Sequence, residues 1–391
     1  MRQGSKRQEL KRQGPKRQGR FGCVALAAAL VLLGCGDDDD TTTADATTTT
    51  AAGGETTTTA AGGETTTTAA GEGAGNEIPE LPEVMVGTEI ETLLKETQPD
   101  DSYEFGFAVP NRADPNFQFM IEKAEEYAET LGITLRVIDP GGYEAGPRQA
   151  DQVDELVQAG VDGIALAAAD AAALGPAVAR AADAGVPVVT FISGENSGRA
   201  VSAVSNNLVE IGVKECENIV AELPEAKVVM LSGPQGAETA AKRAQGFRQC
   251  AEENNLEILA ERFGPSSRDD GLTQMENLYQ SFGDEIGAIY TFSAYIALGA
   301  ADAIQRAGVE SGSIYISTSN PDAEATERLR SGEIRGAVDQ FTGIIASAAL
   351  ATLVQAANGD TVPKAVEVPI DAVSSEEAVD KDWSWSNKVD A

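Results

Sequence analysis

The 391-residue sequence contains no histidine. This absence excludes Ser–His and Cys–His catalysis, histidine metal sites and pH switching by histidine. Basic residues are also scarce, because 29 lysines and arginines stand against 62 aspartates and glutamates. Residues 1–34 hold eight of the basic residues and one acidic residue, so the remainder, with 21 basic and 61 acidic residues, has a net charge of −40. A domain this acidic repels phosphate backbones, which argues against nucleic acid as a partner.

The N-terminus has the charge and hydropathy pattern of an export signal. Basic residues crowd residues 1–20, and the apolar run 21–33 that follows is too short to be a comfortable membrane span. The run ends in Leu32-Leu33-Gly34-Cys35, which resembles the lipobox of bacterial lipoproteins, where the peptidase cuts before a cysteine that becomes diacylated. We therefore predict a signal peptide over residues 1–34 and lipidation of Cys35. This places the protein on the extracytoplasmic side of a bacterial cell membrane, lipid-anchored.

Low-complexity sequence follows the predicted anchor. Residues 47–55 and 56–64 are both Thr-Thr-Thr-Thr-Ala-Ala-Gly-Gly-Glu, and a degenerate third copy comes next. No apolar face can form from such a composition. Residues 35–100 are therefore predicted to be the lipid anchor and a flexible tether.

Two cysteines remain once Cys23 is removed with the signal peptide and Cys35 is lipidated. Cys216 and Cys250 both fall on predicted helices, and an exported protein meets an oxidising compartment that permits a disulfide. Either one bridge or two separate buried thiols satisfies this pattern, because sequence does not supply the Cα separation.

From residue 103 onward, apolar strands alternate with helical periods, and the hydrophobic content of 42% supports sizeable cores. Runs such as 186–191 lack polar alternation, which is typical of strands buried on both faces of a parallel sheet. Gly160, Gly185 and Gly308 each follow a helix and precede a strand, as helix-ending glycines do. Ten strands are too many for one core, so we predict two doubly wound α/β lobes with parallel sheets. The strands are expected at 104–109, 133–138, 163–167, 187–192, 201–204, 227–231, 257–262, 287–291, 313–317 and 335–339.

Several stretches, taken in order, resemble those of the ribose-type (type I) periplasmic binding proteins, the solute receptors of ABC importers. The resemblance covers residues 103–373. The stretches are Asp114-Pro-Asn-Phe117, Ala159-Gly-Val-Asp-Gly-Ile-Ala-Leu166, Ala184-Gly-Val-Pro-Val-Val-Thr-Phe191, Ser205-Asn-Asn-Leu208, Gly233-Pro-Gln-Gly236, Arg243-Ala-Gln-Gly-Phe247, Ala297-Leu-Gly-Ala300 and Gly336-Ala-Val-Asp-Gln340.

The resemblance implies two lobes joined by a hinge of three crossings, near Ser205, Gln340 and Pro369. The N-terminal lobe would comprise 103–205 plus 341–369, and the C-terminal lobe 206–340 plus 370–391. Proteins of this kind close around a ligand without reacting with it.

The loop after the first strand is the first candidate site, on residue chemistry alone. Asp114 suits a helix N-cap and Pro115 the first helical position, so a strand, a polar loop and a helix follow one another. Ligands of parallel α/β sheets sit beyond the C-terminal ends of the strands, over such loops. An ordinary βα turn with a solvated loop is an equal alternative.

The resemblance extends this site to other loops. Phe117 matches the aromatic residue that flanks the sugar, and Gln340 matches a hinge-side amide. Elsewhere the usual sugar clamp is largely missing, so a plain pentose or hexose pocket is not implied. The departures are Asn116 for a second aromatic residue, Ile192-Ser193 for Asp-Arg, Ala241 for an arginine, Ser266 for an aromatic residue, Ser293 for an asparagine and Ser319-Asn320 for Asp-Gly.

The candidate ligand-binding residues are therefore polar loop residues around one aromatic ring. For the polar replacements, including Glu195, Asn196 and Tyr295, a plain surface role is an equal alternative, and Phe292 is expected to be strand-end core. The candidates are Asn111, Arg112, Asp114, Asn116, Phe117, Ser193, Gln235, Ser266, Ser293, Asn320 and Gln340.

The leading hypothesis is a lipid-anchored receptor that delivers a small polar solute, a sugar or sugar derivative, to an ABC permease and its ATPase. The protein would be a monomer without metal or cofactor, and would touch the membrane only through its lipid. A sensor of the same fold that signals ligand occupancy to a membrane receptor is the alternative. An exported enzyme is the third possibility, but no catalytic motif supports it.

Overall fold

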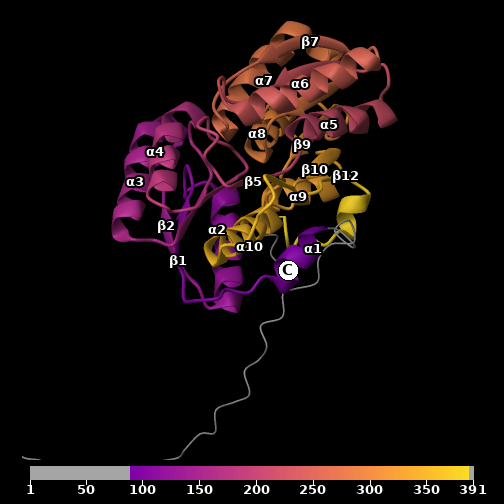
Figure 1. Cartoon of the computed structure of the whole chain (residues 1–391). Coiled ribbons are helices and arrows are strands. Elements are labelled where there is room, and N and C mark those ends of the chain that lie inside the picture. Colours follow the sequence, from indigo (N-terminus) through magenta and orange to yellow (C-terminus); the bar gives the residue numbers. More distant parts are fainter. Residues whose placement is uncertain (1–88, 387–391) are drawn as a thin grey trace, which may run out of the picture. The chain divides into compact units, whose positions relative to one another are not determined.

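A computed structural model describes residues 89–386, and the first lobe within them is built on a six-stranded parallel sheet (Figure 1). The strand order is β11-β5-β4-β3-β1-β2. All residues of β3 and β4 are buried, as the unbroken apolar runs predicted. The strands are β1 (Glu104–Ala108), β2 (Thr134–Ile138), β3 (Gly163–Leu166), β4 (Val188–Phe191), β5 (Ser202–Ser205) and β11 (Ala365–Glu367).

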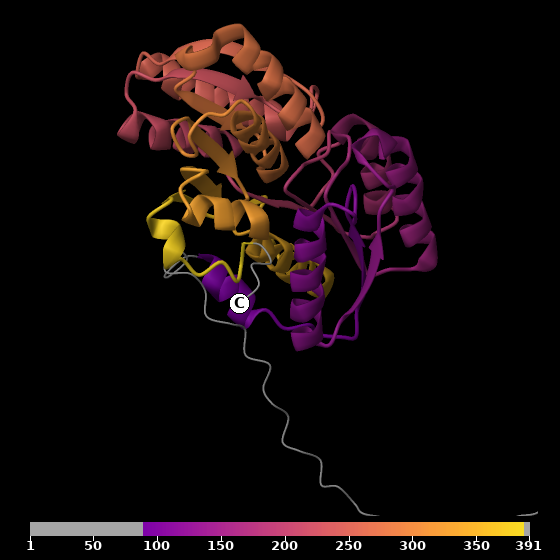
Figure 2. The ribbon, with the colours of Figure 1, turned by 180° about the vertical axis from the view of Figure 1, so that it is seen from behind.

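Helices cover both faces of this first sheet. One apolar core contains residues of α2 and α10, and a second contains residues of α3 and α4. α2 and α10 pack side by side, as Figures 1 and 2 show from opposite directions. The elements are α1 (Glu89–Glu96), α2 (Pro115–Leu131), the 3-10 turn η2 (Tyr143–Ala145), α3 (Gly146–Ala159), α4 (Ala171–Asp183) and α10 (Thr342–Asn358).

The second lobe repeats this architecture, with strand order β12-β10-β9-β8-β6-β7 and an antiparallel edge strand β12. The prediction of two doubly wound lobes is thus confirmed. Its strands are β6 (Lys227–Leu231), β7 (Glu257–Arg262), β8 (Ala288–Thr291), β9 (Tyr315–Ser319), β10 (Gly336–Asp339) and β12 (Asp371–Ser374). Its helices are α5 (Leu208–Glu222), α6 (Glu238–Glu253), α7 (Arg268–Phe282), α8 (Ala294–Arg306) and α9 (Ala323–Arg330), with 3-10 turns η3 (Gly283–Glu285) and η4 (Glu377–Val379).

The chain passes between the two sheets three times, from β5 to α5, from β10 to α10 and from β11 to β12. One side chain ties these passages together. The Asn206 amide donates hydrogen bonds to the carbonyl oxygens of Gln340, at 3.1 Å, and Val368, at 2.9 Å. A buried amide that satisfies carbonyls of two other segments fixes where the three passages lie relative to one another.

The tether prediction is wrong at its C-terminal end. Residues 89–96 form α1, whose Ile90 and Leu94 are 2% and 1% exposed and join the first-lobe core. The Tyr127 hydroxyl donates to the Leu94 carbonyl oxygen at 3.0 Å. The folded part therefore begins before residue 103. The predicted signal peptide, Cys35 and the Thr-rich repeats lie outside the described residues.

The assignment of residues 370–391 to the second lobe also needs correction. Trp383 packs in the second-lobe core, whereas Trp385 packs in the first-lobe core, and the Gly343 N–H donates to the Trp385 carbonyl oxygen at 3.0 Å. The chain therefore returns to the first lobe after β12. Buried Asp339 helps to hold this segment through Lys381, whose Nζ lies 3.1 Å from the carboxylate.

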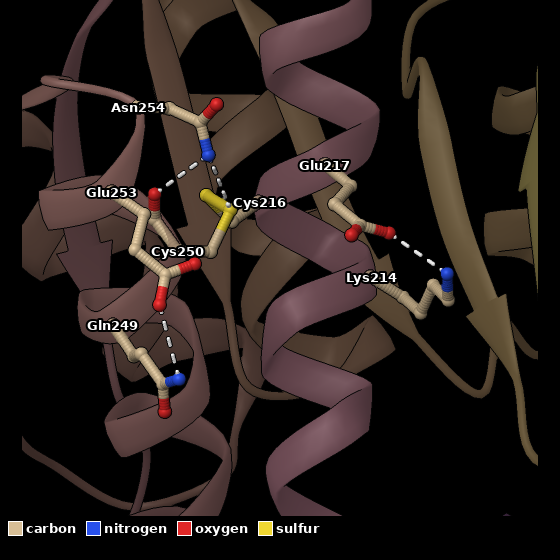
Figure 3. Close-up of a disulfide and its surroundings, with 7 residues drawn as sticks. All are labelled: Lys214, Cys216, Glu217, Gln249, Cys250, Glu253 and Asn254. Atoms are coloured by element: carbon tan, nitrogen blue, oxygen red, sulfur yellow. Dashed lines mark hydrogen bonds and ion pairs between the residues drawn. A yellow bond between two sulfur atoms is a disulfide. The ribbon is translucent and has the colours of Figure 1, made fainter.

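A disulfide joins α5 to α6 through Cys216 and Cys250, whose Cα atoms are 6.1 Å apart (Figure 3). One turn earlier on each helix, Gly212 and Gly246 allow close approach. A Cβ on Gly212 would lie 1.9 Å from the Arg243 carbonyl oxygen, and a Cβ on Gly246 would lie 1.9 Å from the Val209 carbonyl oxygen. The helix pair that carries Arg243 is thus fixed by both backbone packing and a covalent bond.

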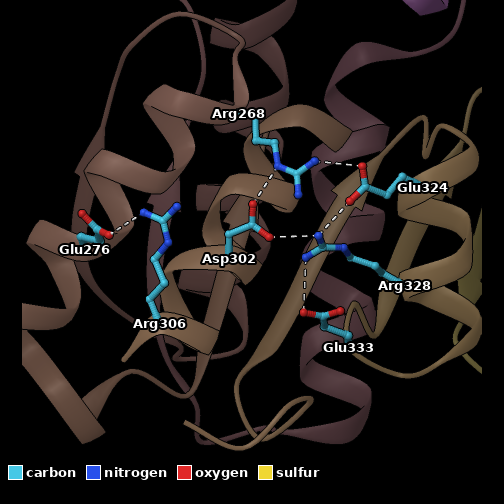
Figure 4. Close-up of polar contacts among 7 residues, drawn as sticks. All are labelled: Arg268, Glu276, Asp302, Arg306, Glu324, Arg328 and Glu333. Atoms are coloured by element: carbon cyan, nitrogen blue, oxygen red, sulfur yellow. Dashed lines mark hydrogen bonds and ion pairs between the residues drawn. The ribbon is translucent and has the colours of Figure 1, made fainter. Parts of the chain in front are cut away.

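A network of ion pairs joins α7, α8 and α9 on the second lobe (Figure 4). Asp302 contacts both Arg268, at 2.7 Å, and Arg328, at 2.9 Å, while Glu324 contacts the same two arginines at 2.8 Å. Arg328 is the most buried member, with 17% of its side chain exposed. Linked charges of this kind hold helices in place better than isolated surface pairs do. No helix within residues 89–386 has the length and apolar character that crossing a membrane requires.

Candidate functional site

A pocket of about 810 Å³, its open mouth included, lies where loops of both lobes meet. Its walls come from segments that follow β1, β2 and β4 in the first lobe and β6, β7, β8 and β9 in the second. This is the position at which parallel α/β sheets place their ligands. The lining residues are Asp114, Asn116, Phe117, Tyr143, Ile192, Pro234, Ala237, Thr239, Arg243, Ser266, Phe292, Ser293, Ala294, Tyr295, Ser319, Asn320 and Asp322.

Two N-cap aspartates, one from each lobe, face this pocket. Asp114 caps α2 by accepting from the Asn116 N–H at 2.9 Å, and Asp322 caps α9 by accepting from the Ala325 N–H at 2.8 Å. Burial raises the pKa of both carboxyls, against the lowering effect of these backbone hydrogen bonds. The charge of Asp322 further raises the pKa of Asp114. The pocket therefore presents two carboxylates that favour hydrogen-bond donors.

Arg243 of α6 forms the floor of the pocket. Its Nη1 donates to the Ser319 hydroxyl at 3.0 Å, its Nη2 donates to the Gln340 Oε1 at 3.0 Å, and its guanidinium lies 4.9 Å from the centroid of the Phe292 ring. Only 6% of this arginine is exposed. Burial lowers its pKa, which neighbouring Tyr290 and Glu215 raise again. Its terminal nitrogens are bonded to the protein, whereas its buried Nε has no hydrogen-bond partner among residues 89–386.

Four aromatic residues line the walls of the pocket. Phe117 is 2% exposed and belongs to the first-lobe core as well as to the pocket wall, and its ring centroid lies 6.4 Å from that of Tyr143. Phe292 was expected to be strand-end core alone, but it also lines the pocket and stacks against Arg243. Tyr295 is the fourth. Rings of this kind suit the apolar faces of a ligand ring.

Four buried polar atoms of pocket-lining residues have no hydrogen-bond partner among residues 89–386. They are Asn116 Oδ1, Arg243 Nε, Tyr295 Oη and Asn320 Oδ1. Burial raises the pKa of the Tyr295 phenol, and the charges of Asp114 and Asp322 add to the increase, so this hydroxyl stays protonated. Buried polar groups are normally satisfied, so unpartnered atoms on residues that line a pocket indicate a ligand that supplies a partner.

Backbone strain is also concentrated here. Four described non-glycine residues have positive φ, and two of them, Ile192 at 59° and Asn320 at 48°, line the pocket. A β-branched residue such as Ile192 in this region is a true outlier. A third, Phe341 at 49°, lies in the second passage between the lobes. Such strain persists where the surrounding structure enforces it, commonly at binding sites and hinges.

The structure brings six of the predicted residues into the pocket, namely Asp114, Asn116, Phe117, Ser266, Ser293 and Asn320. The hydroxyls of Ser266 and Ser293 bond each other at 2.7 Å. The remaining candidates lie elsewhere. Asn111 and Gln235 line a neighbouring cavity, and Arg112 is exposed and lines neither space.

Two further candidates are engaged with the protein itself. Ser193 Oγ donates to the Ala168 carbonyl oxygen at 2.8 Å, and Glu195 accepts from backbone N–H groups of its own loop, including that of Ala200 at 3.3 Å. Gln340 is 1% exposed and does not line the pocket; its Oε1 accepts from Arg243, and its Nε2 has no hydrogen-bond partner among residues 89–386. The hinge-side amide therefore positions the pocket floor.

Among the lining residues that sequence reasoning missed are Tyr143, Thr239, Arg243 and Asp322. A signal for Asp322 was present, because it follows a strand and precedes a helix as Asp114 does. Arg243 stood within a stretch that carried the resemblance. Tyr143 follows Gly141-Gly142 after β2, a position that a strand-end rule would have included.

A two-lobed α/β chain with a pocket lined by both lobes over the C-terminal ends of both sheets has the architecture of a solute-binding protein. The family model described as periplasmic binding protein domain matches residues 105–361, and the chain belongs to this family.

Known proteins of this family are similar across most of the chain. The ribose import binding protein of Bacillus subtilis is 27% identical over 269 residues, which cover 68% of this chain and 86% of that protein. Two solved structures share the fold. The periplasmic ribose ABC transporter protein of Conexibacter woesei has a TM-score of 0.68 at 22% identity and covers 74% of this chain and 99% of its own. The Caulobacter myo-inositol binding protein has a TM-score of 0.67 at 23% identity. The match covers 72% of this chain and 96% of that protein.

Proposed function

We infer that this protein is a lipid-anchored receptor that binds a neutral, ring-shaped polyhydroxylated solute, a sugar or cyclic polyol, and delivers it to an ABC importer. The observation that carries this inference is the set of unpartnered polar atoms on Asn116, Tyr295 and Asn320 in a pocket walled by aromatic rings. Apolar ring faces and dense hydroxyl edges occur together in such solutes. The relatives' names, which include ribose and myo-inositol, fit this chemistry.

The charges of the pocket favour a neutral solute over an anionic one. Two carboxylates, Asp114 and Asp322, line it, whereas its one lining arginine, Arg243, already bonds Ser319 and Gln340. A phosphate or carboxylate on the ligand would meet like charges in a partly buried space, which is unfavourable. Hydroxyl groups can donate to carboxylate and amide oxygens and accept from the Tyr295 hydroxyl.

Delivery to a membrane importer follows from the family together with the N-terminal sequence. The Leu32-Leu33-Gly34-Cys35 motif supports a lipid on Cys35, and the Thr-rich stretch supports a tether that lets the lobes reach a permease. Cell fractionation tests the anchor. A Cys35→Ala chain should leave the membrane fraction or stay unprocessed, and its normal retention as a processed membrane protein would contradict lipidation.

Binding itself is tested by calorimetry on the full chain in mild detergent. The probes are neutral pentoses, hexoses and inositols, including ribose and myo-inositol, with ribose 5-phosphate and glucuronate as anionic counterparts. We expect at least one neutral probe to bind and the anions to bind more weakly. Tyr295→Phe removes only a hydroxyl that lacks a protein partner, so it should cost about 1–3 kcal/mol of binding free energy without loss of stability.

The matched control is Tyr279→Phe on α7, whose hydroxyl bonds exposed Asp284. It should leave binding unchanged. If no neutral polyol binds, or if Tyr295→Phe and Tyr279→Phe both bind like the parent chain, the assignment of this pocket is wrong.

A further inference from the structure

A second cavity, of about 1050 Å³ with its open mouth, borders the ligand pocket, and we call it the outer chamber. Four residues, Asp114, Tyr143, Pro234 and Ser266, line both spaces. The two spaces therefore meet at a shared wall, and a ligand seated against Phe117 and Asn320 can extend outward past Tyr143. As in the ligand pocket, the walls of the outer chamber come from both lobes.

The outer chamber gathers exposed aromatic rings. Among residues 89–386, three large hydrophobic residues are exposed: Tyr143 at 42%, Phe263 at 45% and Val379 at 57%. Two of the three line the outer chamber, one from each lobe. A single exposed ring is ordinary, but two that flank one cavity leave apolar faces in water at a place where a ligand can cover them.

Tyr143 stands at the boundary between the ligand pocket and the outer chamber. Burial raises the pKa of the Tyr143 phenol, and the charge of Asp114 adds to the increase. Tyr143 lines both the ligand pocket and the outer chamber, and its ring centroid lies 6.4 Å from that of Phe117. Tyr143 thus separates the two spaces and contributes to both.

The segments that carry both rings are fixed by backbone hydrogen bonds. Before Tyr143, the Gly142 N–H donates to the Pro110 carbonyl oxygen at 2.9 Å. After Phe263, the Gly264 N–H donates to the Gly233 carbonyl oxygen at 3.0 Å. A Cβ on Gly264 would meet the side-chain ends of Asp270 and Gln274. The backbone next to each ring is thus fixed before any ligand arrives, which lowers the ordering cost of binding.

Planar amides accompany the two rings. Asn111 of the first lobe and Gln235 of the second line the outer chamber, although neither reaches the ligand pocket. An amide offers donors and an acceptor to neighbouring hydroxyls on a sugar ring. The Asn111 Oδ1 already accepts from the Ala113 N–H at 2.9 Å, so Asn111 offers mainly its N–H donors. Rings for the apolar faces and amides for the polar edges are the same pair of chemistries that the ligand pocket shows. Glu144 adds a negative charge, which favours a neutral occupant.

We propose that the solute is a neutral glycoside, whose first ring occupies the ligand pocket and whose second ring, a sugar or an aryl group, occupies the outer chamber between Tyr143 and Phe263. This inference rests on the proposed function, because it assigns the inner ring to the pocket described above. It explains why a cleft that departs from a compact monosaccharide clamp keeps two exposed rings at its mouth.

The test compares three classes of probe on the full chain by calorimetry. The first class is the free sugars ribose, glucose, galactose and myo-inositol, and the second is the methyl β-glycosides of the three aldoses. The third is their phenyl β-glycosides together with cellobiose, lactose, maltose and galactinol. Methyl glycosides control for loss of the anomeric hydroxyl, so any gain of the third class over the second reports on the second ring. We expect at least one member of the third class to bind at least about tenfold tighter than its methyl or free counterpart.

Phe263→Ala should remove most of this gain by weakening the binding of the third class at least about fivefold. The affinities of the free sugars and methyl glycosides should stay unchanged. Val379→Ala, which truncates the exposed hydrophobic residue that lies away from both spaces, should change neither. Three results would overturn the proposal: equal binding of second and third classes, exclusion of the third class, or an equal effect of Phe263→Ala on all classes. The proposed function survives those three results, whereas binding of none of the probes would refute both.

Discussion

Glu215 on α5 is fully buried, and neither of its carboxylate oxygens has a hydrogen-bond partner within the described part of the chain. Burial therefore raises its pKa well above the usual value of 4.5, although nearby Arg243 opposes the increase. We predict that Glu215 is neutral in the folded protein. The alternative is an ionised Glu215 beside Arg243, and the two states give different pH dependence of stability above pH 5.

The sign follows from proton linkage. A carboxyl whose folded pKa exceeds its unfolded pKa holds a proton in the native state that the unfolded chain has released. Its contribution to stability is complete below about pH 4.5 and declines as pH rises toward the folded pKa. One such group changes the free energy of unfolding by at most about 1.4 kcal/mol per pH unit. Glu215→Gln, which is neutral at every pH, abolishes this decline.

The measurement is urea unfolding from pH 5 to pH 8, followed by the fluorescence of the chain's two tryptophans, one of which, Trp383, lies in the second-lobe core. The stability of Glu215→Gln relative to the parent chain should increase with pH. Glu217→Gln on the same helix is the matched control, because Glu217 is half-exposed and pairs with Lys214 at 2.8 Å. A constant difference between Glu215→Gln and the parent chain across this range would show that Glu215 is ionised, and the reasoning from burial would fail.

Two further predictions concern stability. The Cys216–Cys250 bridge spans a sequence separation of 34, so its reduction should lower the free energy of unfolding by about 3–4 kcal/mol. Non-reducing peptide mapping should find the two cysteines in one linked pair, and separate free thiols would contradict the bridge. Lys381→Met leaves the carboxylate of fully buried Asp339 without its cation and should cost about 3–5 kcal/mol in urea unfolding, while Lys364→Met, at an exposed position, should cost almost nothing. Equal losses for the two lysine variants would refute the role of the buried pair.

The parts of the fold that could be predicted from sequence are those with local signals. Long apolar runs, helical periods and helix-ending glycines predicted ten strands and two lobes. Asp114 and Pro115 predicted the start of α2, and that cap also places Asp114 in the pocket. Here the local rule and the functional position coincide, because a helix N-terminus after a parallel strand faces the ligand edge of the sheet.

The elements that were missed are short and depend on distant partners. α1 has eight residues and follows low-complexity sequence, so only its burial against α10 reveals it. β11 and β12 have three and four residues and exist through pairing with β5 and β10. The return of Trp385 to the first lobe depends likewise on its contact with Gly343. No sequence window contains this information, because segments this short are stable only through tertiary packing.

Gln340 shows why the candidate site could be predicted only in part. Its amide suits a ligand hydroxyl and an arginine equally well, so residue chemistry alone could not separate the two roles. In the structure Gln340 is 1% exposed and its Oε1 accepts from Arg243, while its Nε2 has no hydrogen-bond partner within the described residues. Its carbonyl oxygen accepts from Asn206 in the first passage between the lobes. One residue thus joins the pocket floor to the hinge, so the position of Arg243 and the arrangement of the passages are not independent.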